Sequence, residues 1–378
     1  MVVGLPGFYS SPFGRFAGLQ GDLLVCSNED FPFDYLFVSF CLQPFQYMLK
    51  VCHIISGDLW AGAEVMAYHL LKGLRPYGDL SITTAIVLNE GRLAEELRKQ
   101  GITVNVVDES KSSFLNLFKI IKKILVQSPP DIIHSHRYKE NFLAYLTSRS
   151  IHDIKLIVTQ HGMPEVYGEN SSLKQRLITK GNFFGLSLFF NRTVAVSEDI
   201  QKALIKQFRF RESKISMIHN GIKIPDFVPE RENEGTLVIG SAGRLCPVKD
   251  YTFMIEIAKA VKEETKHIKF HLAGEGPERS KLQSLIQQYG LNETFVLQGH
   301  VDNMLLFYRR LDLYLNISVH EGIPMSILEA MAHSLPVVAP DVGGISEVVS
   351  NGEDGFSEKS EIQRHSLKSV FCCMKISN

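Results

Sequence analysis

Residues His320–Glu347 read HEGIPMSILEAMAHSLPVVAPDVGGISE, and this stretch says more about the fold than any other part of the chain. Two carboxylates, Glu321 and Glu329, stand eight positions apart with Gly322 and Pro324 between them. Proline suits the first turn of a helix, where its missing N–H is not needed, so the order predicts a loop that turns into a helix. The backbone N–H groups at a helix start lack intrahelical partners and the dipole is positive there, so this place suits a phosphate or a developing anion.

The helix predicted after this loop has one apolar face. We expect that face to pack on a sheet, and it holds Ile327, Leu328, Met331 and Leu335. Glu321 would then lie just before the helix and Glu329 about one turn inside it. A bare pair of glutamates at this spacing is common by chance and fits an ordinary surface helix equally well. The whole string, with Pro336 and a glycine pair at 343–344 before Glu347, favours a ligand-binding loop.

The segment resembles the E-x7-E signature of the family-4 retaining glycosyltransferases, which have the two-domain GT-B fold. The resemblance implies that Glu321 lies beside the donor sugar and that Glu329 binds the ribose hydroxyls of the nucleotide. We also expect donor contacts along the loop and the helix start, at Gly322, Ile323, Pro324, Met325 and Ser326. The fold class expected is α/β, with two Rossmann-like, doubly wound parallel-sheet domains that face each other across a cleft.

A second loop, GSAGRLCPVKD at Gly240–Asp250, follows a predicted strand and precedes a predicted helix. Small residues such as Gly243 let a ligand approach the backbone closely. Arg244 and Lys249 supply two cations, of which a guanidinium can bind a phosphate through two parallel hydrogen bonds and an ammonium acts as a point charge. A basic loop with solvated side chains is the alternative. The loop resembles the family's G-R-x-x-x-x-K element, which implies that Arg244 and Lys249 bind the donor diphosphate.

A third loop, AGEGP at Ala273–Pro277, resembles a segment that lines the nucleotide pocket in the family, so we expect Glu275 to contact the donor. A tight strand-to-helix turn would have the same composition. The loop is not a G-x-G-x-x-G fingerprint, because Arg279 occupies the third glycine position. A dinucleotide-dependent dehydrogenase is therefore disfavoured.

In the first half of the chain, ISGDLWAGAEVMAYHLL follows the first predicted strand and contains Trp60, the only tryptophan. The family usually has a Gly-Gly pair here that approaches the donor phosphates. Ala61 replaces the first glycine of the pair, so close backbone approach is expected at Gly62 alone. We expect Glu64 to serve the helix start, where an acidic side chain is favourable, rather than the chemistry.

His161 lies in TQHGMPE at the end of a predicted strand and is followed by Gly162. Its position resembles the active-site histidine of the family, which hydrogen-bonds the donor sugar. A structural histidine is the alternative, because the chain has 13 of them. The HSH at 134–136 also ends a strand but fits no metal-ligand set. Ser197 is predicted to cap a helix whose first turn contains Asp199.

The residues expected to carry catalysis are His161, Glu321, Arg244 and Lys249. No D-x-D occurs in the sequence, which agrees with a metal-independent scheme in which cationic side chains and a helix N-terminus stabilise the leaving diphosphate. No cofactor is expected beyond the nucleotide diphosphate sugar as co-substrate. The resemblance implies transfer of a hexosyl group to a hydroxyl of a saccharide or lipid-linked acceptor, with retention, in polysaccharide or lipopolysaccharide synthesis. Two alternatives stay open: a GT-B sugar-nucleotide epimerase, and a truncated, non-catalytic remnant that binds nucleotide sugar or a partner.

Length and composition set broad limits on the protein. A chain of 378 residues is long enough for two domains, and 45% hydrophobic with 21% charged residues is typical of globular proteins. The net charge of −1 gives no reason to expect nucleic acid as a partner. The six cysteines are scattered without zinc spacing, which favours a reduced cytoplasmic setting. They are Cys26, Cys41, Cys52, Cys246, Cys372 and Cys373.

Alternation of apolar strands with helical patterns predicts parallel sheets covered on both faces. The first domain is expected over 48–221 and the second, donor-binding domain over 236–360, with a linker at 222–235. The strands predicted in the first domain are Val51–Ser56, Ile82–Leu88, Thr103–Val107, Ile132–His134, Leu156–Thr159 and Thr193–Val196. Those predicted in the second are Leu237–Ser241, Lys269–Ala273, Thr294–Gln298, Leu313–Asn316 and Val337–Ala339. Two helices are predicted between the latter, over Asp250–Glu264 and Arg279–Tyr289.

Both ends of the chain depart from this pattern. Residues 1–47 mix Gly, Pro, Phe and Ser without a helical or strand period, so we expect a poorly ordered extension and a natural start at Met48. NGEDGF at Asn351–Phe356 resembles the point where the family enters its last small strand. The atypical tail at 361–378 is too short for the helices that follow that strand in the family, so the second domain is expected to be incomplete.

The most apolar stretch is FFGLSLFF at Phe183–Phe190, which is too short to span a bilayer. Its flanks are basic, at Lys174, Arg176, Lys180 and Arg192. A helix of this kind could contact an anionic membrane surface, and a core helix with a solvated end is the alternative. The expected location is the cytoplasm, with peripheral contact at the inner face of the membrane as the further option.

Overall fold

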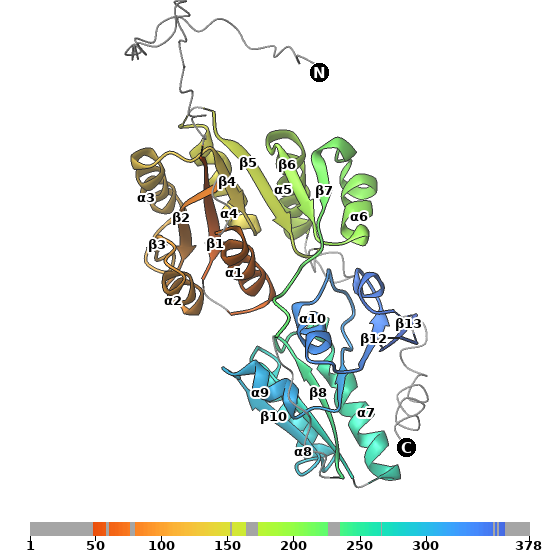
Figure 1. The fold of residues 1–378 in the computed structure, drawn as a ribbon. Helices are drawn as coiled ribbons and strands as arrows, with labels where there is room; N and C mark the ends of the chain where they lie inside the picture. Colours follow the sequence, from red (N-terminus) through yellow and green to blue (C-terminus); the bar gives the residue numbers. More distant parts are fainter. Residues whose placement is uncertain are drawn as a thin grey trace, which may run out of the picture. The chain divides into compact units, whose positions relative to one another are not determined.

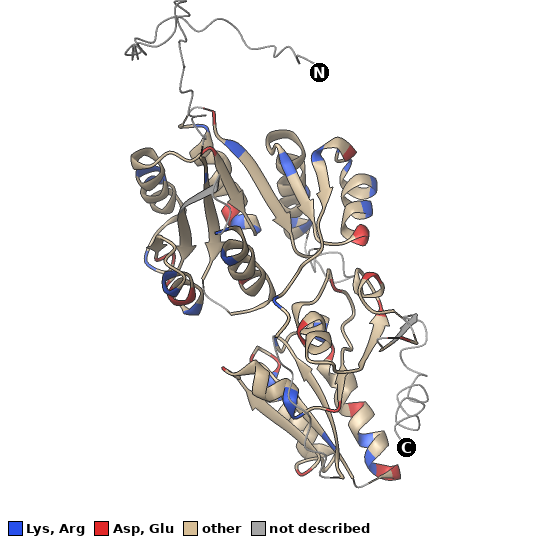
Figure 2. Cartoon of the chain, viewed as in Figure 1, with Lys and Arg blue, Asp and Glu red and all other residues tan. Residues whose placement is uncertain are grey.

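In the computed structural model, the chain is described at residues 48–57, 60–75, 80–151, 153–163, 173–225, 235–265, 267–350, 352–353 and 355–359. The extension expected at 1–47, the tail expected at 361–378 and most of the linker expected at 222–235 lie outside these residues. The described residues form two α/β domains, each built on one parallel sheet (Figure 1). Strands in both sheets are mostly uncharged, as expected for sheets covered on both faces (Figure 2).

The first sheet has seven strands in the order β3-β2-β1-β4-β5-β6-β7, and every pairing is parallel. Its strands are β1 (Leu49–Ser56), β2 (Leu80–Leu88), β3 (Val104–Val107), β4 (Ile132–Ser135), β5 (Lys155–Gln160), β6 (Arg192–Ala195) and β7 (Ile215–Met217). Its helices are α1 (Gly62–Leu74), α2 (Arg92–Lys99), α3 (Phe114–Gln127), α4 (Tyr138–Ser148), α5 (Leu173–Phe189) and α6 (Glu198–Phe208), with a short 3-10 helix, η2 (Glu212–Lys214).

The strand period of two divides the core of this domain between the two faces of the sheet. On β1, Ile55 packs with residues of α1 and α2, including Leu71 and Leu93. Its neighbour Ile54 packs on the opposite side with residues of α3 to α6. Both faces of β1 are therefore buried, which explains why apolar residues occupy both faces of the strand, with Lys50 exposed and His53 as a buried polar residue.

The second sheet has six strands in the order β10-β9-β8-β11-β12-β13, again all parallel. Its strands are β8 (Leu237–Ala242), β9 (Ile268–Ala273), β10 (Phe295–Gly299), β11 (Leu313–Leu315), β12 (Val337–Asp341) and β13 (Gly355–Lys359). Its helices are α7 (Tyr251–Glu264), α8 (Arg279–Gln288), α9 (Met304–Arg309) and α10 (Met325–Ala332), with the 3-10 helices η3 (Pro247–Lys249) and η4 (Ile345–Glu347). On β11, Leu313 and Leu315 pack toward α7 and α8, and Tyr314 packs toward α9 and α10.

The predicted strands are all present, most within one or two residues of the expected ends. The helix after the Glu321 loop was predicted too long. It ends at Ala332 because Ser334 takes a left-handed conformation with φ 57°, so Leu335 is buried just beyond the helix rather than on its face. The prediction did not include β7 or α9.

Candidate functional site

The loop between β11 and α10 is held in place by two glycines. Gly343 has φ 59°, and a Cβ added there would lie 1.7 Å from the carbonyl oxygen of Glu321. The N–H of Gly344 donates to the carbonyl oxygen of Gly322 at 3.0 Å. Both positions therefore need glycine, because a side chain would push away the segment that carries Glu321.

The structure brings together Lys249 and Glu321, which are 72 positions apart in the sequence. The ammonium of Lys249 forms an ion pair with Oε1 of Glu321, and their side chains are only 19% and 13% exposed. The hydroxyl of Ser318 donates to the same carboxylate oxygen at 2.7 Å. Burial alone would lower the pKa of Lys249, but the charge and hydrogen bond of Glu321 outweigh it and the pKa is raised. Lys249 is therefore a cation at neutral pH that is already neutralised by a neighbour.

The Gly243 loop and the Glu275 loop lie against each other beside this pair. A Cβ on Gly243 would lie 2.6 Å from the hydroxyl of Tyr251 and 3.5 Å from Cε of Lys249. The N–H of Leu245 donates to the carbonyl oxygen of Glu275 at 2.9 Å. The backbone at Gly243 therefore lies close to the side chain of Lys249, and the close approach of a ligand to this loop stays a prediction.

Two predicted donor contacts do not join this cluster through their side chains. Arg244 is exposed and makes no side-chain hydrogen bond or ion pair within the described part of the chain. The carboxylate of Glu275 is half-exposed and pairs with Arg279 at 2.8 Å on the surface. Arg244 is available to a ligand, whereas Glu275 already has a cationic partner.

Glu329 lies inside α10, one turn from its start, as predicted. Its Oε2 accepts a hydrogen bond from the hydroxyl of Tyr308 at 2.7 Å. Burial raises the pKa of this carboxyl group, and the hydrogen bond from Tyr308 opposes that rise. The other oxygen, Oε1, makes no hydrogen bond to any described residue, so it can accept one from a ligand hydroxyl.

A group of buried tyrosines near these carboxylates was not predicted from the sequence. Tyr314, on β11, accepts from the N–H of Ala242 and donates to its carbonyl oxygen, both at 3.2 Å. The rings of Tyr308 and Tyr314 lie 6.0 Å apart. Burial raises the pKa of Tyr251, Tyr308 and Tyr314, so all three stay neutral donors. Nothing in their local sequence marked them, because the contacts join separate strands and helices.

Residues of the first domain reach the Glu321 loop. A Cβ on Gly322 would lie 2.4 Å from the carbonyl oxygen of His161, so the predicted histidine is in contact with the predicted donor loop. Its Nε2 hydrogen-bonds Nδ1 of His136 at 3.2 Å. The side chain of Asn220 donates to the carbonyl oxygen of Ile323 at 2.8 Å. The structure thus gathers Glu321, Lys249 and His161 around one loop.

The helix α6 meets the second domain at its N-terminus. Ser197 caps the helix by accepting from the N–H of Ile200 at 3.2 Å, as predicted. The carboxylate of Glu347 accepts from the N–H groups of Glu198 at 2.9 Å and Asp199 at 3.4 Å. It also lies 2.9 Å from Nε2 of His219. A negative charge at a helix N-terminus is favourable, so this contact ties the two domains together.

The start of α1 leaves room for a ligand at Gly62. A Cβ added at Gly62 would meet no atom within 4 Å, and the preceding Ala61 offers no side-chain cap. Glu64 is buried in the first turn of α1 and pairs with Arg137 at 2.6 Å. The prediction that Glu64 serves the helix start is consistent with this position, and the arginine partner was not foreseen.

Two family models match the chain. Residues 60–224 match "Glycosyltransferase Family 4" and residues 223–369 match "Glycosyl transferases group 1". Together the two matches cover most of the chain, and they meet between the two sheets.

Several characterised proteins are similar to the chain in sequence. The capsular polysaccharide biosynthesis glycosyltransferase CapH of Staphylococcus aureus is 27% identical over 80% of this chain and 84% of its own length. The UDP-Gal:alpha-D-GlcNAc-diphosphoundecaprenol alpha-1,3-galactosyltransferase of Escherichia coli is 26% identical over 67% of each chain.

Solved structures share the fold. Anabaena HepE in complex with UDP-glucose superposes with a TM-score of 0.74 over 87% of this chain and 90% of that one, at 20% identity. The structure of TarM superposes with a TM-score of 0.71 over 86% of this chain and 92% of that one, at 14% identity. These likenesses show that the two sheet domains have the GT-B arrangement.

Proposed function

The chain belongs to the family-4, group 1 glycosyltransferases, and from that premise we propose that it transfers a hexosyl unit from a nucleotide diphosphate sugar to a hydroxyl group with retention. The C1–O bond to the diphosphate breaks and a C1–O bond to the acceptor forms on the same face of the sugar. The acceptor's hydroxyl proton passes to the leaving phosphate oxygen. Positive charge develops on the sugar ring and negative charge on the diphosphate, as in other glycosyl chemistry.

The observation that carries this proposal is the buried pair of Lys249 and Glu321 beside the Gly243 backbone. A diphosphate next to Gly243 would take Lys249 as its cation, and Arg244 is exposed nearby to bind a second oxygen. The first N–H groups of α10 supply further donors at a positive helix end. These groups stabilise the leaving anion without a metal ion, which we propose as the mode of catalysis.

Glu321 would orient the sugar hydroxyls, because its carboxylate lies on the loop that His161 contacts from the first domain. Glu329 would bind the ribose through Oε1, while Tyr308 holds its Oε2. His161 would hydrogen-bond the donor sugar through Nδ1, which bonds no described residue, since Nε2 is bound by His136. Each role follows from an atom that a described neighbour leaves available.

The acceptor is proposed to be a saccharide or a lipid-linked saccharide of the cell envelope. Of the relatives above, CapH belongs to capsular polysaccharide biosynthesis, and the Escherichia coli enzyme transfers galactose to GlcNAc-diphosphoundecaprenol. We propose a cytoplasmic enzyme that contacts an anionic membrane through α5. That helix buries only Phe183 and Leu186 of its own residues. It exposes a set of large apolar side chains, Leu173, Leu177, Ile178, Phe184, Leu188 and Phe189. One face of α5 packs into the core of the first domain through Phe183 and Leu186, and the proposal concerns the exposed face.

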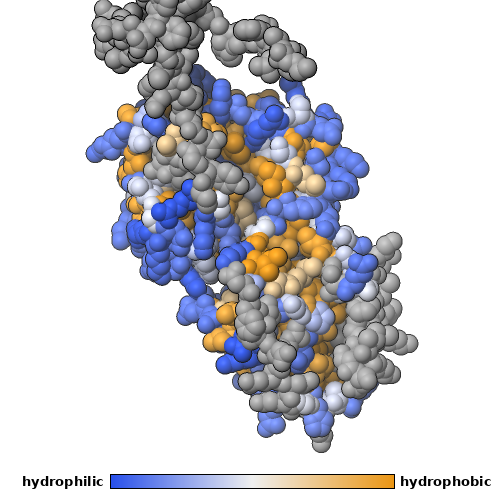
Figure 3. Space-filling model, in the orientation of Figure 1, coloured by the Kyte–Doolittle hydropathy of each residue, from blue (hydrophilic) through white to orange (hydrophobic). Residues whose placement is uncertain are grey.

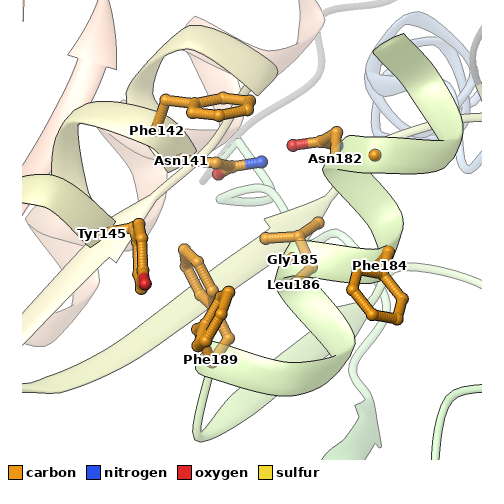
Figure 4. Close-up of a pocket in the computed structure, with 10 residues that line it drawn as sticks. Asn141, Phe142, Tyr145, Asn182, Phe184, Gly185, Leu186 and Phe189 are labelled. Carbon is orange, nitrogen blue, oxygen red and sulfur yellow. The ribbon is translucent and has the colours of Figure 1, made fainter. Parts of the chain in front are cut away.

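The α4–α5 surface supports this membrane contact. An apolar pocket lies between the two helices and is lined by Phe142, Tyr145, Phe184 and Phe189 among others (Figure 4). Exposed basic residues precede it on α5, at Lys174, Arg176 and Lys180. Figure 3 shows the face seen in Figure 1, in which α5 lies behind β6, and apolar areas lie between hydrophilic ones on that face as well. Among the described residues, no helix has both the length and the apolar character to cross a bilayer. Binding to vesicles with and without anionic lipid, compared for the chain and a Phe184→Ser, Phe189→Ser variant, tests this contact.

A thermal-shift panel of UDP-, GDP- and ADP-sugars tests the donor, since a bound ligand raises the melting temperature by mass action. Hydrolysis of the stabilising sugar nucleotide is then compared between the chain and Lys249→Ala. Lys99→Ala is the matched control, because Lys99 also pairs with a glutamate but is 65% exposed. We expect hydrolysis to be nearly abolished in the first variant and unchanged in the second.

Other outcomes of these assays would reject the proposal. Stabilisation by a sugar nucleotide without hydrolysis or transfer to any acceptor would indicate a binding remnant. Conversion of the sugar nucleotide to its epimer would indicate an epimerase. Equal activity of the Lys249→Ala and Lys99→Ala variants would remove Lys249 from the site.

A further inference from the structure

Four histidines of the first domain lie in a row at the carboxyl ends of three adjacent strands. His53 is on β1, His134 is on β4, His136 follows β4 and His161 follows β5, and these strands are neighbours in the order β1-β4-β5. Nδ1 of His53 lies 3.3 Å from Nε2 of His136. Nδ1 of His136 lies 3.2 Å from Nε2 of His161. Three imidazoles therefore form a hydrogen-bonded chain that ends at the proposed donor-sugar ligand.

All of these rings are neutral at physiological pH. Burial, together with the smaller effects of the nearby His134 and Arg137, lowers the pKa of His161 to about 3. Burial is also the main cause that lowers the pKa of His53 and His136 well below the ordinary value. A neutral imidazole has one N–H donor and one bare nitrogen acceptor. The chain of hydrogen bonds must therefore run in a single direction along all three rings.

The buried end of the chain sets that direction. Nε2 of His53 is buried and has no hydrogen-bond partner among the described residues. If the chain ran from His161 toward His53, this atom would carry a buried N–H without an acceptor. If it runs outward, the atom is a bare nitrogen, and an unpaired acceptor is more often tolerated in proteins than an unpaired N–H. The outward direction is favoured: His53 donates to His136, and His136 donates to His161.

We infer that His53 and His136 are positioning residues that hold His161 in the tautomer with a proton on Nδ1 and a bare Nε2. This inference rests on the proposed function in one respect, namely that Nδ1 of His161 faces the donor sugar. Nδ1 makes no hydrogen bond within the described part of the chain, and the residue as a whole keeps some solvent exposure although burial dominates the surroundings of its ring. The Nδ1–H can then donate to a sugar or phosphate oxygen. We call the hydrogen-bonded chain of His53, His136 and His161 the relay. Free histidine prefers the tautomer with the proton on Nε2, so the relay would reverse the usual preference.

A metal ion bound by His53, His134 and His136 is the competing interpretation, because their ring nitrogens lie within 4.8 Å of one another. The existing contacts oppose it. Nε2 of His134 already lies 2.8 Å from the hydroxyl of Thr159. The rings of His134 and His136 are stacked, with centroids 4.5 Å apart and planes 23° apart, so their lone pairs do not converge on one point. Both nitrogens of His136 are used in the relay.

Nitrogen-15 NMR of the full chain, labelled at histidine and free of ligand, tests the relay without any assay of activity. A protonated ring nitrogen and a bare one have well-separated shifts, and a His161→Asn variant identifies the His161 signals. We expect Nδ1 of His161 to carry the proton. The Nε2–H form in the wild-type chain would overturn the inference. So would one equivalent of zinc in the purified chain whose removal by a chelator shifts the His53 and His136 signals.

Two variants of His136 separate the effect of its hydrogen-bond donor on the tautomer of His161 from the effect of its packing. In His136→Asn the amide N–H₂ replaces the donor at Nδ1, so the His161 tautomer should persist. In His136→Leu the donor is lost, so His161 should revert to the Nε2–H form, and an unchanged spectrum would refute the relay. His271→Asn is the control, because His271 hydrogen-bonds Gln298 in the second sheet and should leave the His161 signals unchanged.

The kinetics of donor hydrolysis are measured separately from the NMR spectra. In His136→Leu we expect kcat of donor hydrolysis to fall about fivefold to tenfold, as for one lost hydrogen bond, with unchanged affinity for the nucleoside diphosphate. His136→Asn should restore most of kcat. If the spectra agree with the relay but no sugar nucleotide is turned over by the wild-type chain, the proposed function fails and the relay stands. If turnover is normal while the tautomer is wrong, the relay fails alone.

Discussion

Removing one member of the Lys249–Glu321 pair should destabilise the second domain, and removing both should cost less than the two single losses together. Breaking a fully buried ion pair from one side costs ~3–5 kcal/mol because a charge is left without a partner. The side chains of Lys249 and Glu321 are 19% and 13% exposed, so solvent screens part of that cost. We therefore expect about 2–3 kcal/mol for Lys249→Met and for Glu321→Gln.

Urea unfolding followed by circular dichroism measures these losses, with the double variant completing a mutant cycle. The coupling energy should be at least about 1 kcal/mol. The pKa of Lys249 is raised above its ordinary 10.5, so the ammonium's contribution is fully present below pH 10.5 and is lost only as the pH rises above that value. The coupling should therefore stay constant between neutral pH and pH 9.

Lys99→Met is the control for this cycle. Lys99 pairs with Glu96 at 2.7 Å but is 65% exposed, so its loss should cost less than ~0.5 kcal/mol. Additive losses in the double variant, or equal losses for Lys249→Met and Lys99→Met, would show that the buried pair does not act as a unit. Burial would then not determine how much the Lys249–Glu321 pair contributes to stability, even if both residues contact the donor.

Three further results are expected. Glu329→Gln should bind the nucleotide about tenfold more weakly, as for a lost charged hydrogen bond. This variant should also have a higher melting temperature than the wild-type chain at pH 7 but not at pH 4. The raised pKa of the Glu329 carboxyl group means that its ionisation costs the folded state stability as the pH rises. A melting temperature below that of the wild-type chain at pH 7 would contradict this. Burial lowers the pKa of His134 to about 4, so the free energy of unfolding should fall as the pH drops from 6.5 toward 4. His134→Gln should reduce this dependence of the unfolding free energy on pH, measured by urea titrations. An unchanged dependence would exclude His134 as a cause. Gly343→Ala should lower the melting temperature by more than Gly352→Ala. Both glycines have positive φ, but of the two only Gly343 would place its Cβ against the backbone of Glu321. Equal losses would mean that the strain of a positive φ alone matters.

The strand and helix order was largely predictable because local patterns determine it. A parallel sheet buried on both faces favours strands that are largely apolar on both faces, and β1 and β8 have this character next to glycine-containing loops. The end of α10 was not predictable from the same pattern. Ser334 takes a left-handed backbone conformation that usually favours glycine or asparagine, so nothing in the residue type marked the stop.

The site was predictable only in part, for a physical reason. Motifs that follow strands predicted Lys249, Glu321, Glu329 and His161 as site residues, because parallel strands place their carboxyl ends at the same edge of the sheet. The partners of these residues come from other helices and strands that are distant in the sequence. Tyr308 meets Glu329 from 21 positions away, and His53 meets His136 from 83 positions away. A tyrosine or histidine in a strand looks like core until its neighbour is known.

The Lys249–Glu321 pair also explains why a cation can be kept ready in this site. A lone buried ammonium would lose its charge or attract any small anion, whereas the carboxylate of Glu321 neutralises it in the resting chain. Under the proposed function, a diphosphate that takes over Lys249 leaves Glu321 without its partner. The sugar attached to that diphosphate supplies hydroxyl donors for the carboxylate, whereas phosphate alone does not. A ligand with both parts satisfies both residues, so the pairing itself selects for a sugar joined to a diphosphate.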